Sequence, residues 1–598
     1  MTDCRAKATL QAMAVLGIVF SGPAFAAELA QSAPPVRLQA PRSVTPEEQK
    51  PAPVAEPAPG KVAEKPFDVA PAPPIDIDSL GALDEASGGF PASVWQGSPR
   101  RSLQSLLTAL PNAMSSPTLR SLKRKLLMTA AIVPEAVSGA ADTKSFMTLR
   151  ANALFASGEL AGSMELINAV PSRGEHPDLA RIQIEGLLLA YDNAGACALA
   201  RTAIARFQDA YWQKALIFCQ TLAGDHGKAA LGLGLLREMQ TEDDPAFVRL
   251  VAALGGDAKS VVESLPRPQP LHLAMLRAAR QNLPRDALNS ADLAALRIVA
   301  TSPNASLDLR LSAAERAEAA GVVTAEALGL IYDSVPFTPE QLGGAATVAN
   351  LDAGPRGRAL LYRAARVQTA PPARTVLLQR SLGLGKKWEE YLTAVRVTLP
   401  MLLEIAPSDE TAPLAPTLTR AMLAAGRPAE ARVWFALVQD AAKAKEDAAK
   451  AEAALWPLVR LAAGDEAGPW EARRMKDWLA AAVKAEDKAA NDRAALLLTL
   501  LVAAGETVDA ADWAPLMVDF KFQDAAMPPP SLWLGLRAAS RAGRVGETIL
   551  ESLVMLGDRF PQASSPYVLA EALGALRAVG LGAEARALAL EAALAAGL

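Results

Sequence analysis

The sequence predicts an all-α protein, and three observations support this prediction. Hydrophobic residues make up 51% of the 598 residues and aromatic residues only 5%, so the apolar mass is mostly Ala, Leu and Val. Such a composition favours closely packed helices over a β architecture. A short phrase also recurs along the chain: a helical run, a Gly, one or two polar residues and a second helical run. Most copies are 29 to 41 residues apart, which is the unit length of helix-hairpin repeats.

The first 26 residues have the pattern of a secretory signal peptide. Arg5 and Lys7 precede an apolar run, Leu10 to Phe20, and Ala24-Phe25-Ala26 offers small residues at the two positions that a signal peptidase reads. As a membrane anchor the run would rise only ~16 Å, about half of a bilayer core. Cys4 lies before the run, whereas a lipoprotein cysteine would follow it. We therefore expect cleavage after Ala26 and a periplasmic or otherwise exported protein, with no transmembrane segment after signal removal.

Residues 27–88 are predicted to form a disordered Pro/Ala-rich linker. Dense proline prevents both helix ladders and a packed core. If extended, ~50 residues at about 3.1 Å each would reach on the order of 150 Å. Two interpretations remain open, a spacer that lets the folded part work away from a tethering point and a leader without a partner. The prolines are Pro34, Pro35, Pro41, Pro46, Pro51, Pro53, Pro57, Pro59, Pro66, Pro71, Pro73 and Pro74.

Residues 89–150 are predicted to form a basic N-terminal helical cap. No acidic residue occurs between Glu85 and Glu135, which leaves this segment locally basic in a chain of net charge -4. One interpretation is docking to an anionic surface, such as lipid head groups, an anionic envelope polymer or an acidic partner. The other is a solvated helical face at the start of the array. The candidate contact residues are Arg100, Arg101, Arg120, Lys123, Arg124 and Lys125.

Residues 151–598 carry the recurring phrase and are predicted to be a helical repeat region. A helix hairpin needs one residue at positive φ to end its first helix, and Gly adopts that conformation without a steric penalty. A small residue, Ala, stands five positions after the Gly in five of the ten units and would let the two helices approach closely. The turn glycines are Gly158, Gly195, Gly224, Gly256, Gly321, Gly426, Gly464, Gly505, Gly543 and Gly580, with Gly385 as a marker of a degraded unit.

This pattern resembles the tetratricopeptide family, whose unit is about 34 residues with a small residue early in its second helix. The unit around Gly195 fits best, with Tyr191 before the turn and Ala200 after it, although the family's full Trp, Gly and Pro consensus is not met. The resemblance implies a right-handed solenoid of antiparallel helix hairpins. The chain is also similar to uncharacterised secreted proteobacterial proteins sometimes labelled antifreeze glycopeptide polyproteins. That label implies Ala-Ala-Thr repeats, which this sequence lacks, so no functional expectation follows from it.

Two cysteines, Cys197 and Cys219, remain after signal removal. If a helix over 196–207 turns near Gln208 into an antiparallel helix starting near Ala210, residues whose numbers sum to about 416 face one another. Cys197 and Cys219 satisfy this relation, and an oxidising compartment would favour a disulfide. Two buried free thiols are the alternative.

No motif in the sequence indicates a catalytic, cofactor or metal site. The histidines, His176, His226 and His272, are far apart and lack metal-ligand spacing. We find no Gly-rich phosphate loop, nucleophile elbow or Cys-x-x-Cys pair. The near-neutral charge gives no indication of nucleic-acid binding. We therefore expect neither an enzyme nor a cofactor.

Two function classes remain. Stacked helix hairpins form extended surfaces that bind proteins or peptides, which favours a non-catalytic exported scaffold or adaptor with protein partners in the cell envelope. The alternative is an envelope enzyme that acts on peptidoglycan or polysaccharide and has an α-helical toroid or solenoid architecture. The repeat phrase runs to within about 20 residues of the end of the sequence, and six tyrosines and three histidines provide few residues for a sugar cleft. Both observations favour the scaffold.

Overall fold

The structure of the chain is a computed structural model. It describes residues 76–135, 145–239, 244–289, 292–348, 351–483, 488–517, 527–558, 560–561 and 564–598. Contacts divide the chain into two units, Met1–Pro73 and Pro74–Leu598, and all described residues belong to the second. The predicted signal peptide and residues 27–75 of the predicted linker lie outside the described residues.

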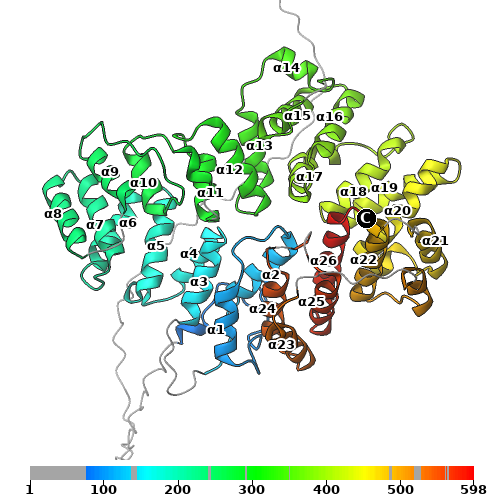
Figure 1. Cartoon of the computed structure of the whole chain (residues 1–598), viewed down its shortest axis with the longest axis horizontal. Helices are drawn as coiled ribbons and strands as arrows, with labels where there is room; N and C mark the ends of the chain where they lie inside the picture. The colour runs from blue at the N-terminus through cyan, green and yellow to red at the C-terminus, as the bar shows by residue number, and fades with distance from the viewer. Residues whose placement is uncertain are drawn as a thin grey trace, which may run out of the picture. The chain divides into compact units, whose positions relative to one another are not determined.

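All regular secondary structure in the described residues is helical, and apart from one isolated bridge between Leu83 and Thr129 they form no β-structure (Figure 1). This confirms the predicted all-α class. The first half contains η1 (Ile77–Ser79), α1 (Arg100–Ala109), α2 (Pro117–Met128), α3 (Phe146–Ala156), α4 (Leu160–Asn168), η2 (Arg173–Glu175), α5 (Pro177–Leu189), α6 (Asn193–Ala203), α7 (Ala210–Leu222), α8 (His226–Glu238), α9 (Pro245–Leu254), α10 (Pro270–Ala278), η3 (Arg285–Asn289), α11 (Leu293–Thr301), α12 (Leu307–Ala319) and α13 (Ala325–Asp333).

The second half contains α14 (Pro339–Gly344), α15 (Pro355–Val367), α16 (Pro371–Leu384), α17 (Trp388–Leu403), η4 (Ala412–Leu414), α18 (Ala415–Ala424), α19 (Pro428–Ala442), α20 (Glu446–Ala463), η5 (Gly464–Ala467), α21 (Ala472–Ala482), α22 (Lys488–Ala504), η6 (Ala510–Met517), α23 (Pro530–Arg541), α24 (Val545–Leu556), α25 (Pro566–Ala578) and α26 (Gly582–Ala595). None of these helices combines the length and the apolar character that crossing a bilayer requires.

The predicted glycine turns are present in nine of the ten units, where the Gly has a positive φ between 54° and 104°. Gly426, for example, has φ 69° and separates α18 from α19, which pack against each other. The left-handed conformation ends the first helix and reverses the chain. The local pattern therefore identified these turns correctly.

The unit around Gly195 differs from the prediction. Tyr191 takes the left-handed conformation with φ 69°, and Gly195 lies inside α6, where its N–H donates to the side chain of Asp192 at 2.7 Å. The ring of Tyr191 packs under the guanidinium of Arg277, which lies 3.8 Å from the ring centroid. The small residue five positions after this turn is Ala196, which is 1% exposed.

Gly385 does not mark a turn of this kind, because its φ is -71° and its backbone is extended. A Cβ at this position would lie only 2.8 Å from the backbone N of Tyr391, so close packing explains the glycine. Four of the five alanines expected after the turns, Ala200, Ala229, Ala431 and Ala585, are each at most 2% exposed. The fifth, Ala510, is exposed, so the prediction of close helix packing is wrong at that position.

Helices that follow one another in the sequence pack against each other along most of the chain, for example α5 on α6, α6 on α7 and α7 on α8. The first helices also contact the last ones: α1 packs on α24, and α2 packs on both α24 and α26. Figure 1 shows α2 in blue beside α24 in orange-brown, with α26 in red near them. We call this contact between residues 90–128 and α24–α26 the closure.

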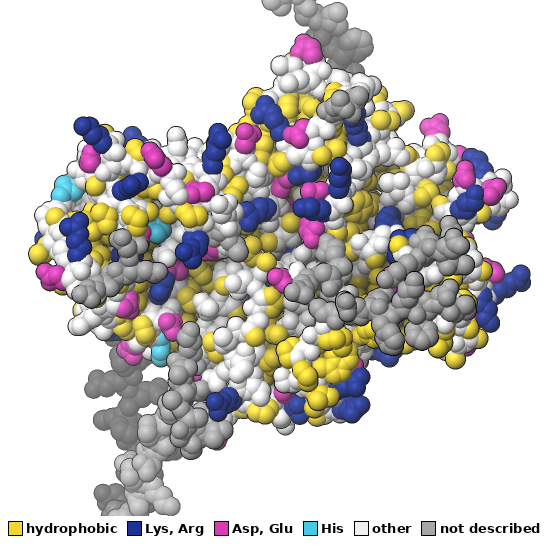
Figure 2. Space-filling view, viewed as in Figure 1, with side chains coloured by type: hydrophobic (Ala, Val, Ile, Leu, Met, Phe, Trp, Pro, Cys, Tyr) yellow, Lys and Arg dark blue, Asp and Glu magenta, His cyan; other side chains and the backbone are white. Residues whose placement is uncertain are grey.

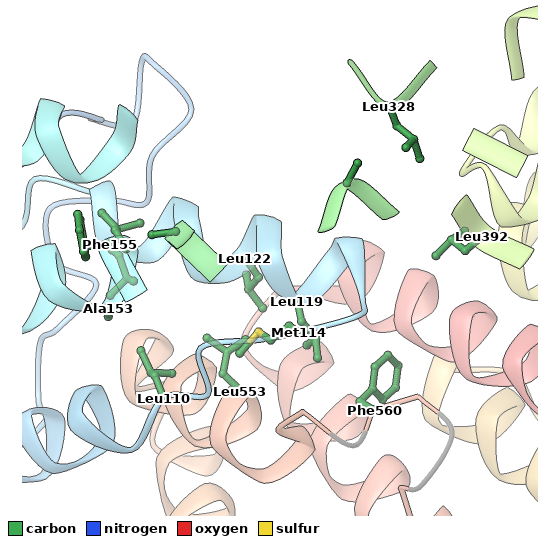
Figure 3. Close-up of a cluster of buried hydrophobic side chains, with 14 of the residues drawn as sticks. Leu110, Met114, Leu119, Leu122, Ala153, Phe155, Leu328, Leu392, Leu553 and Phe560 are labelled. Carbon is green, nitrogen blue, oxygen red and sulfur yellow. The ribbon is translucent and has the colours of Figure 1, made fainter. Parts of the chain in front are cut away.

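The closure is built from main-chain hydrogen bonds and apolar packing. The N–H of Gly546 donates to the carbonyl of Val94 at 2.9 Å, and Trp95 is completely buried. Leu119 of α2 and Leu553 of α24 are also completely buried. Figure 3 shows both side chains, together with Met114 and Phe560, in one apolar cluster. Residues from the two ends of the described body therefore share one core.

Residues 76–88 belong to the folded body, and the linker predicted over 27–88 is too long at its C-terminal end. The N–H groups of Ala82 and Leu83 donate to the carbonyl of Met128 at 2.9 and 3.0 Å. The guanidinium of Arg150, which has no exposed surface, donates to the carbonyls of Asp78 and Leu80. Hydrogen bonds to α2 and α3 therefore hold this segment against the helices, although its composition predicted that it belongs to the linker.

Candidate functional site

A cavity of about 550 Å³ lies between the connection from α1 to α2 and the helices α11, α12, α15 and α17. Its walls come from regions that are far apart in the sequence: the α1–α2 connection, α11, α12, the first turns of α15 and α17, and the loop after α24. Most of the lining is apolar, with charged side chains among it. The lining residues are Ala113, Met114, Ser115, Leu293, Leu296, Ser312, Glu315, Arg316, Ala319, Ala320, Pro355, Arg358, Lys387, Glu389, Glu390, Thr393 and Asp558. We call it the central cavity.

One wall of the central cavity holds a network around Glu315. Arg358 donates to both oxygens of this carboxylate, from Nε at 2.9 Å and from Nη2 at 2.5 Å, and the Tyr332 hydroxyl donates to Oε1 at 2.5 Å. Burial opposes the charge on Arg358, but the bonds to Glu315 raise the pKa of its guanidinium above the usual value. Burial and the neighbouring carboxylate also raise the pKa of Tyr332. Both oxygens of Glu315 are therefore engaged by side chains of the protein.

Glu318, one turn further along α12, is paired in the same way. It is 2% exposed, and its Oε1 and Oε2 accept hydrogen bonds from Arg396 at 2.5 and 2.8 Å. The hydroxyl of Thr393 donates to the same carboxylate at 2.5 Å. Both pairs tie α12 to helices from later in the chain, since Arg358 is on α15 and Arg396 on α17.

Arg120 and Lys123 of α2 lie behind the central cavity and are largely buried. Nη1 of Arg120 donates to the carbonyls of Met114, Ser115 and Ala319 at 2.8, 2.9 and 3.0 Å. Lys123 is 4% exposed, and its Nζ donates to the carbonyl of Pro111 at 2.7 Å and to the hydroxyl of Ser157 at 2.5 Å. Burial lowers the pKa of Arg120 to about 10 and that of Lys123 to about 8.

The six basic residues singled out in the sequence do not form one docking surface. Arg120 and Lys123 face inward, and Arg100 forms an ion pair with the buried Asp78. Arg124 is 3.4 Å from the carboxylate of Glu159. Lys125 lies over the ring of Phe90, 4.4 Å from its centroid, and Arg101 is exposed. Figure 2 shows cationic and anionic side chains interspersed over the visible face. The predicted anionic-surface site is therefore wrong for Arg120 and Lys123, because the α1–α2 connection, Ser157 and the end of α12 cover these two side chains.

Two carboxyl groups of the closure are also buried. Oε1 of Glu591 accepts from the Thr118 hydroxyl at 2.6 Å, and burial raises the pKa of this carboxyl. Glu551 on α24 is 5% exposed, and its Oε2 has no hydrogen-bond partner among the described residues. Burial, and next the charge of Glu547, raise the pKa of Glu551 to about 8, while the neighbouring Arg544 pairs with Glu547 at 2.6 Å. Glu551 is therefore protonated at neutral pH.

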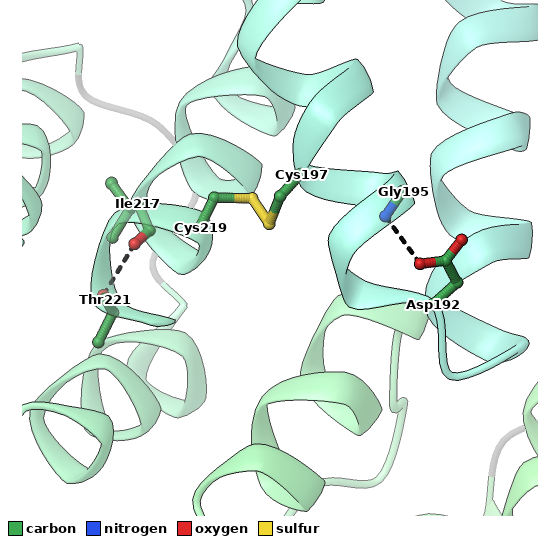
Figure 4. Close-up of a disulfide and its surroundings, with 6 residues drawn as sticks. All are labelled: Asp192, Gly195, Cys197, Ile217, Cys219 and Thr221. Atoms are coloured by element: carbon green, nitrogen blue, oxygen red, sulfur yellow. Dashed lines mark hydrogen bonds between the residues drawn. A yellow bond between two sulfur atoms is a disulfide. The ribbon is translucent and has the colours of Figure 1, made fainter. Parts of the chain in front are cut away.

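Cys197 and Cys219 form a disulfide between α6 and α7, with a Cα–Cα distance of 5.5 Å (Figure 4). The structure thus brings together the pair that antiparallel register predicted. α7 begins at Ala210 as expected, and α6 spans 193–203 rather than 196–207. This small shift leaves the facing positions unchanged.

The histidines remain apart, and only His272 is deeply buried. Its Nε2 lies 3.1 Å from the carboxylate of Asp244, which also accepts from Nζ of Lys214 at 2.6 Å. Burial opposes ionisation of Asp244, but these hydrogen bonds hold its pKa well below the usual range. Across the described ranges, no three His, Cys, Asp or Glu residues are grouped so as to hold a metal ion.

Sequence reasoning missed the central cavity and its arginine–carboxylate pairs. Glu315 and Arg358 are 43 residues apart and belong to no recurring phrase. No local signal in the sequence identifies them. No protein family, curated protein or solved structure matches this chain.

Proposed function

We propose that this chain is an exported, non-catalytic scaffold or adaptor that binds protein partners in the cell envelope. Its helix hairpins would form a right-handed tetratricopeptide-like solenoid, with residues 1–26 acting as a cleaved signal peptide. The observation that supports this proposal best is the central cavity. It has an apolar lining with charged side chains, a combination that suits the binding of a peptide segment or another protein's side chains.

The state of the carboxylates supports binding over chemistry. A general acid needs a carboxyl whose pKa is raised towards the working pH and which faces the substrate. Glu315 on the cavity wall instead accepts hydrogen bonds from Arg358 at both of its oxygens. Glu551, whose pKa is raised, does not line the cavity.

The disulfide supports the proposed location. Cysteine pairs in folded proteins of ordinary bacteria persist mainly in oxidising compartments such as the periplasm. Cys197 and Cys219 are 5% and 3% exposed, so access of a reductant would also be limited.

Site-specific crosslinking in intact cells tests the proposed function. A photo-crosslinking amino acid replaces Lys387, which is exposed at the central cavity, and, as a matched control, Arg237, which is exposed on α8 and lies on no wall of the cavity. We expect protein adducts from position 387, drawn from one envelope assembly, and few from position 237. Equal adducts from both positions, or turnover of cell-wall polymer by the purified chain, would contradict the proposal. Cell fractionation and N-terminal sequencing test export, with Ala27 as the expected first residue.

A further inference from the structure

A second, smaller cavity of about 20 Å³ lies next to the central cavity. Met114 and Ala320 line both cavities, so the two spaces adjoin at these residues. A space of this size holds one water molecule or the oxygen of a ligand that reaches in from outside. The lining residues are Asn112, Met114, Arg120, Lys123, Arg124, Leu154, Ser157, Glu159 and Ala320. We call it the side cavity.

The lining of the side cavity has an excess of positive charge. Arg120, Lys123 and Arg124 face a single carboxylate, that of Glu159, which is engaged with Arg124. Neither Arg120 nor Lys123 has a carboxylate within 4.0 Å among the described residues. Their donated hydrogen bonds go to neutral carbonyls and to the Ser157 hydroxyl.

Buried cations without a counterion are unfavourable, because carbonyl dipoles replace only part of the lost hydration. Each of the two groups shows this cost as a lowered pKa, about 10 for Arg120 and about 8 for Lys123. At Arg120 the charge of Arg396 also lowers the pKa, whereas Glu318, Glu591 and Glu159 act in the opposite direction, as Glu159 does at Lys123. An anion placed in the side cavity would offset this cost, since it would stabilise the charged forms of the two side chains.

We propose that the side cavity is a carboxylate-binding subsite, in which Lys123 and Arg120 hold the head group and the central cavity takes an apolar stem. The small volume favours a planar carboxylate over a phosphate or sulfate. The hydroxyl of Ser157 and the amide of Asn112 supply uncharged polar groups beside the two cations. In the central cavity, beyond Met114 and Ala320, Leu293 and Leu296 offer apolar contacts to the stem.

Two sources share this chemistry, the C-terminal carboxylate of a peptide with apolar last residues and a free medium-chain fatty acid. If the ligand is a peptide C terminus, the subsite takes part in partner recognition, and this assignment rests on the proposed function. The subsite itself does not depend on that source.

Calorimetric titration of the full chain with matched probes tests the subsite. The probes are hexanoate and its uncharged analogue hexanamide, and the peptide acetyl-Ala-Leu-Ala with either a free or an amidated C terminus. We expect each carboxylate to bind at least tenfold more tightly than its neutral partner. Affinity should fall about tenfold between pH 7 and pH 9 as Lys123 loses its proton. Equal binding of the charged and neutral probes would overturn the proposal.

Substitutions identify the residues involved. Lys123→Met should reduce carboxylate affinity at least tenfold and remove the dependence on pH, whereas Arg101→Gln, which removes an exposed cation of α1, should change neither. Circular dichroism checks that both variants are folded, and Ser157→Ala, expected to weaken binding about threefold, covers the case in which Lys123→Met unfolds. Unchanged binding in a folded Lys123→Met variant refutes the proposal. If hexanoate binds and the peptide does not, the subsite is supported and its ligand is a free carboxylate. The proposed function is then tested by the crosslinking experiment alone.

Discussion

The substitution Gly546→Ala tests the closure directly. Gly546 is in the first turn of α24, and its N–H donates to the carbonyl of Val94 at 2.9 Å. A Cβ at this position would lie 2.5 Å from the ring of Trp95 and 2.7 Å from the carbonyl oxygen of Val94. Trp95 is completely buried and cannot move aside without disturbing its neighbours. The alanine therefore forces the two segments apart.

The magnitude follows from two contributions. Overpacking a buried site costs typically about 1–3 kcal/mol, and weakening the hydrogen bond to Val94 costs about 0.5–1.5 kcal/mol. The gain in helix propensity from Gly to Ala, at most about 1 kcal/mol, acts in the opposite direction. We expect the free energy of unfolding to fall by about 0.5–4.5 kcal/mol.

A matched control separates packing from helix propensity. Gly574 lies within α25, and a Cβ there would meet no atom within 4 Å. Gly574→Ala should therefore stabilise the protein by up to about 1 kcal/mol. Urea unfolding followed by circular dichroism measures both variants, and limited proteolysis shows whether residues 76–135 are released. If Gly546→Ala stabilises the chain as much as Gly574→Ala does, the described packing of residues 94–95 on α24 is wrong.

Three further predictions concern other buried features. Gly321→Ala should lower the free energy of unfolding more than Gly426→Ala. Both glycines have positive φ, but only a Cβ at position 321 would collide with Nε of Arg120. The melting temperatures of the two variants measure this difference. Cys197→Ser should cost about 3 kcal/mol by the loop-entropy relation, and mass spectrometry of the native protein should find no free thiol at 197 or 219. The pKa of Glu551 is about 8 in the folded protein, above its unfolded value, so the protonated carboxyl favours folding and this contribution is lost as the pH rises from 5 to 8. Glu551→Gln should therefore remove a decline in the free energy of unfolding of up to about 1.4 kcal/mol per pH unit over this range. Urea midpoints measured at several pH values check this, and an equal pH dependence in both proteins would contradict it.

Local features were predictable from the sequence because their cause lies within a few residues. A glycine such as Gly224 or Gly426 between two helical runs specifies a left-handed turn, and the turn fixes which residues face each other across the hairpin. The pairing of Cys197 with Cys219 follows from the same register. The Tyr191 turn escaped prediction because Gly195, four residues later, gives the stronger local signal.

The candidate site was not predictable because distant segments form it. The basic residues of α2 predicted an exposed cationic surface because, from the sequence alone, α2 is expected to lie at the end of a helical array. Nη1 of Arg120 donates to the carbonyl of Ala319 across 199 residues of sequence, and Lys123 is buried against the α1–α2 connection and Ser157 at the end of α3. A single sequence contains no periodic signal for such a contact.

The closure also constrains the order of events during folding. A ribosome adds about 5–20 residues per second, so the 473 residues between Thr118 and Glu591 correspond to roughly 25–90 s of synthesis. During that interval Trp95, Leu119 and their neighbours lack the surface against which they pack in the finished protein. A nascent chain of this kind has an early-made apolar segment that requires protection from aggregation until the last helix is complete.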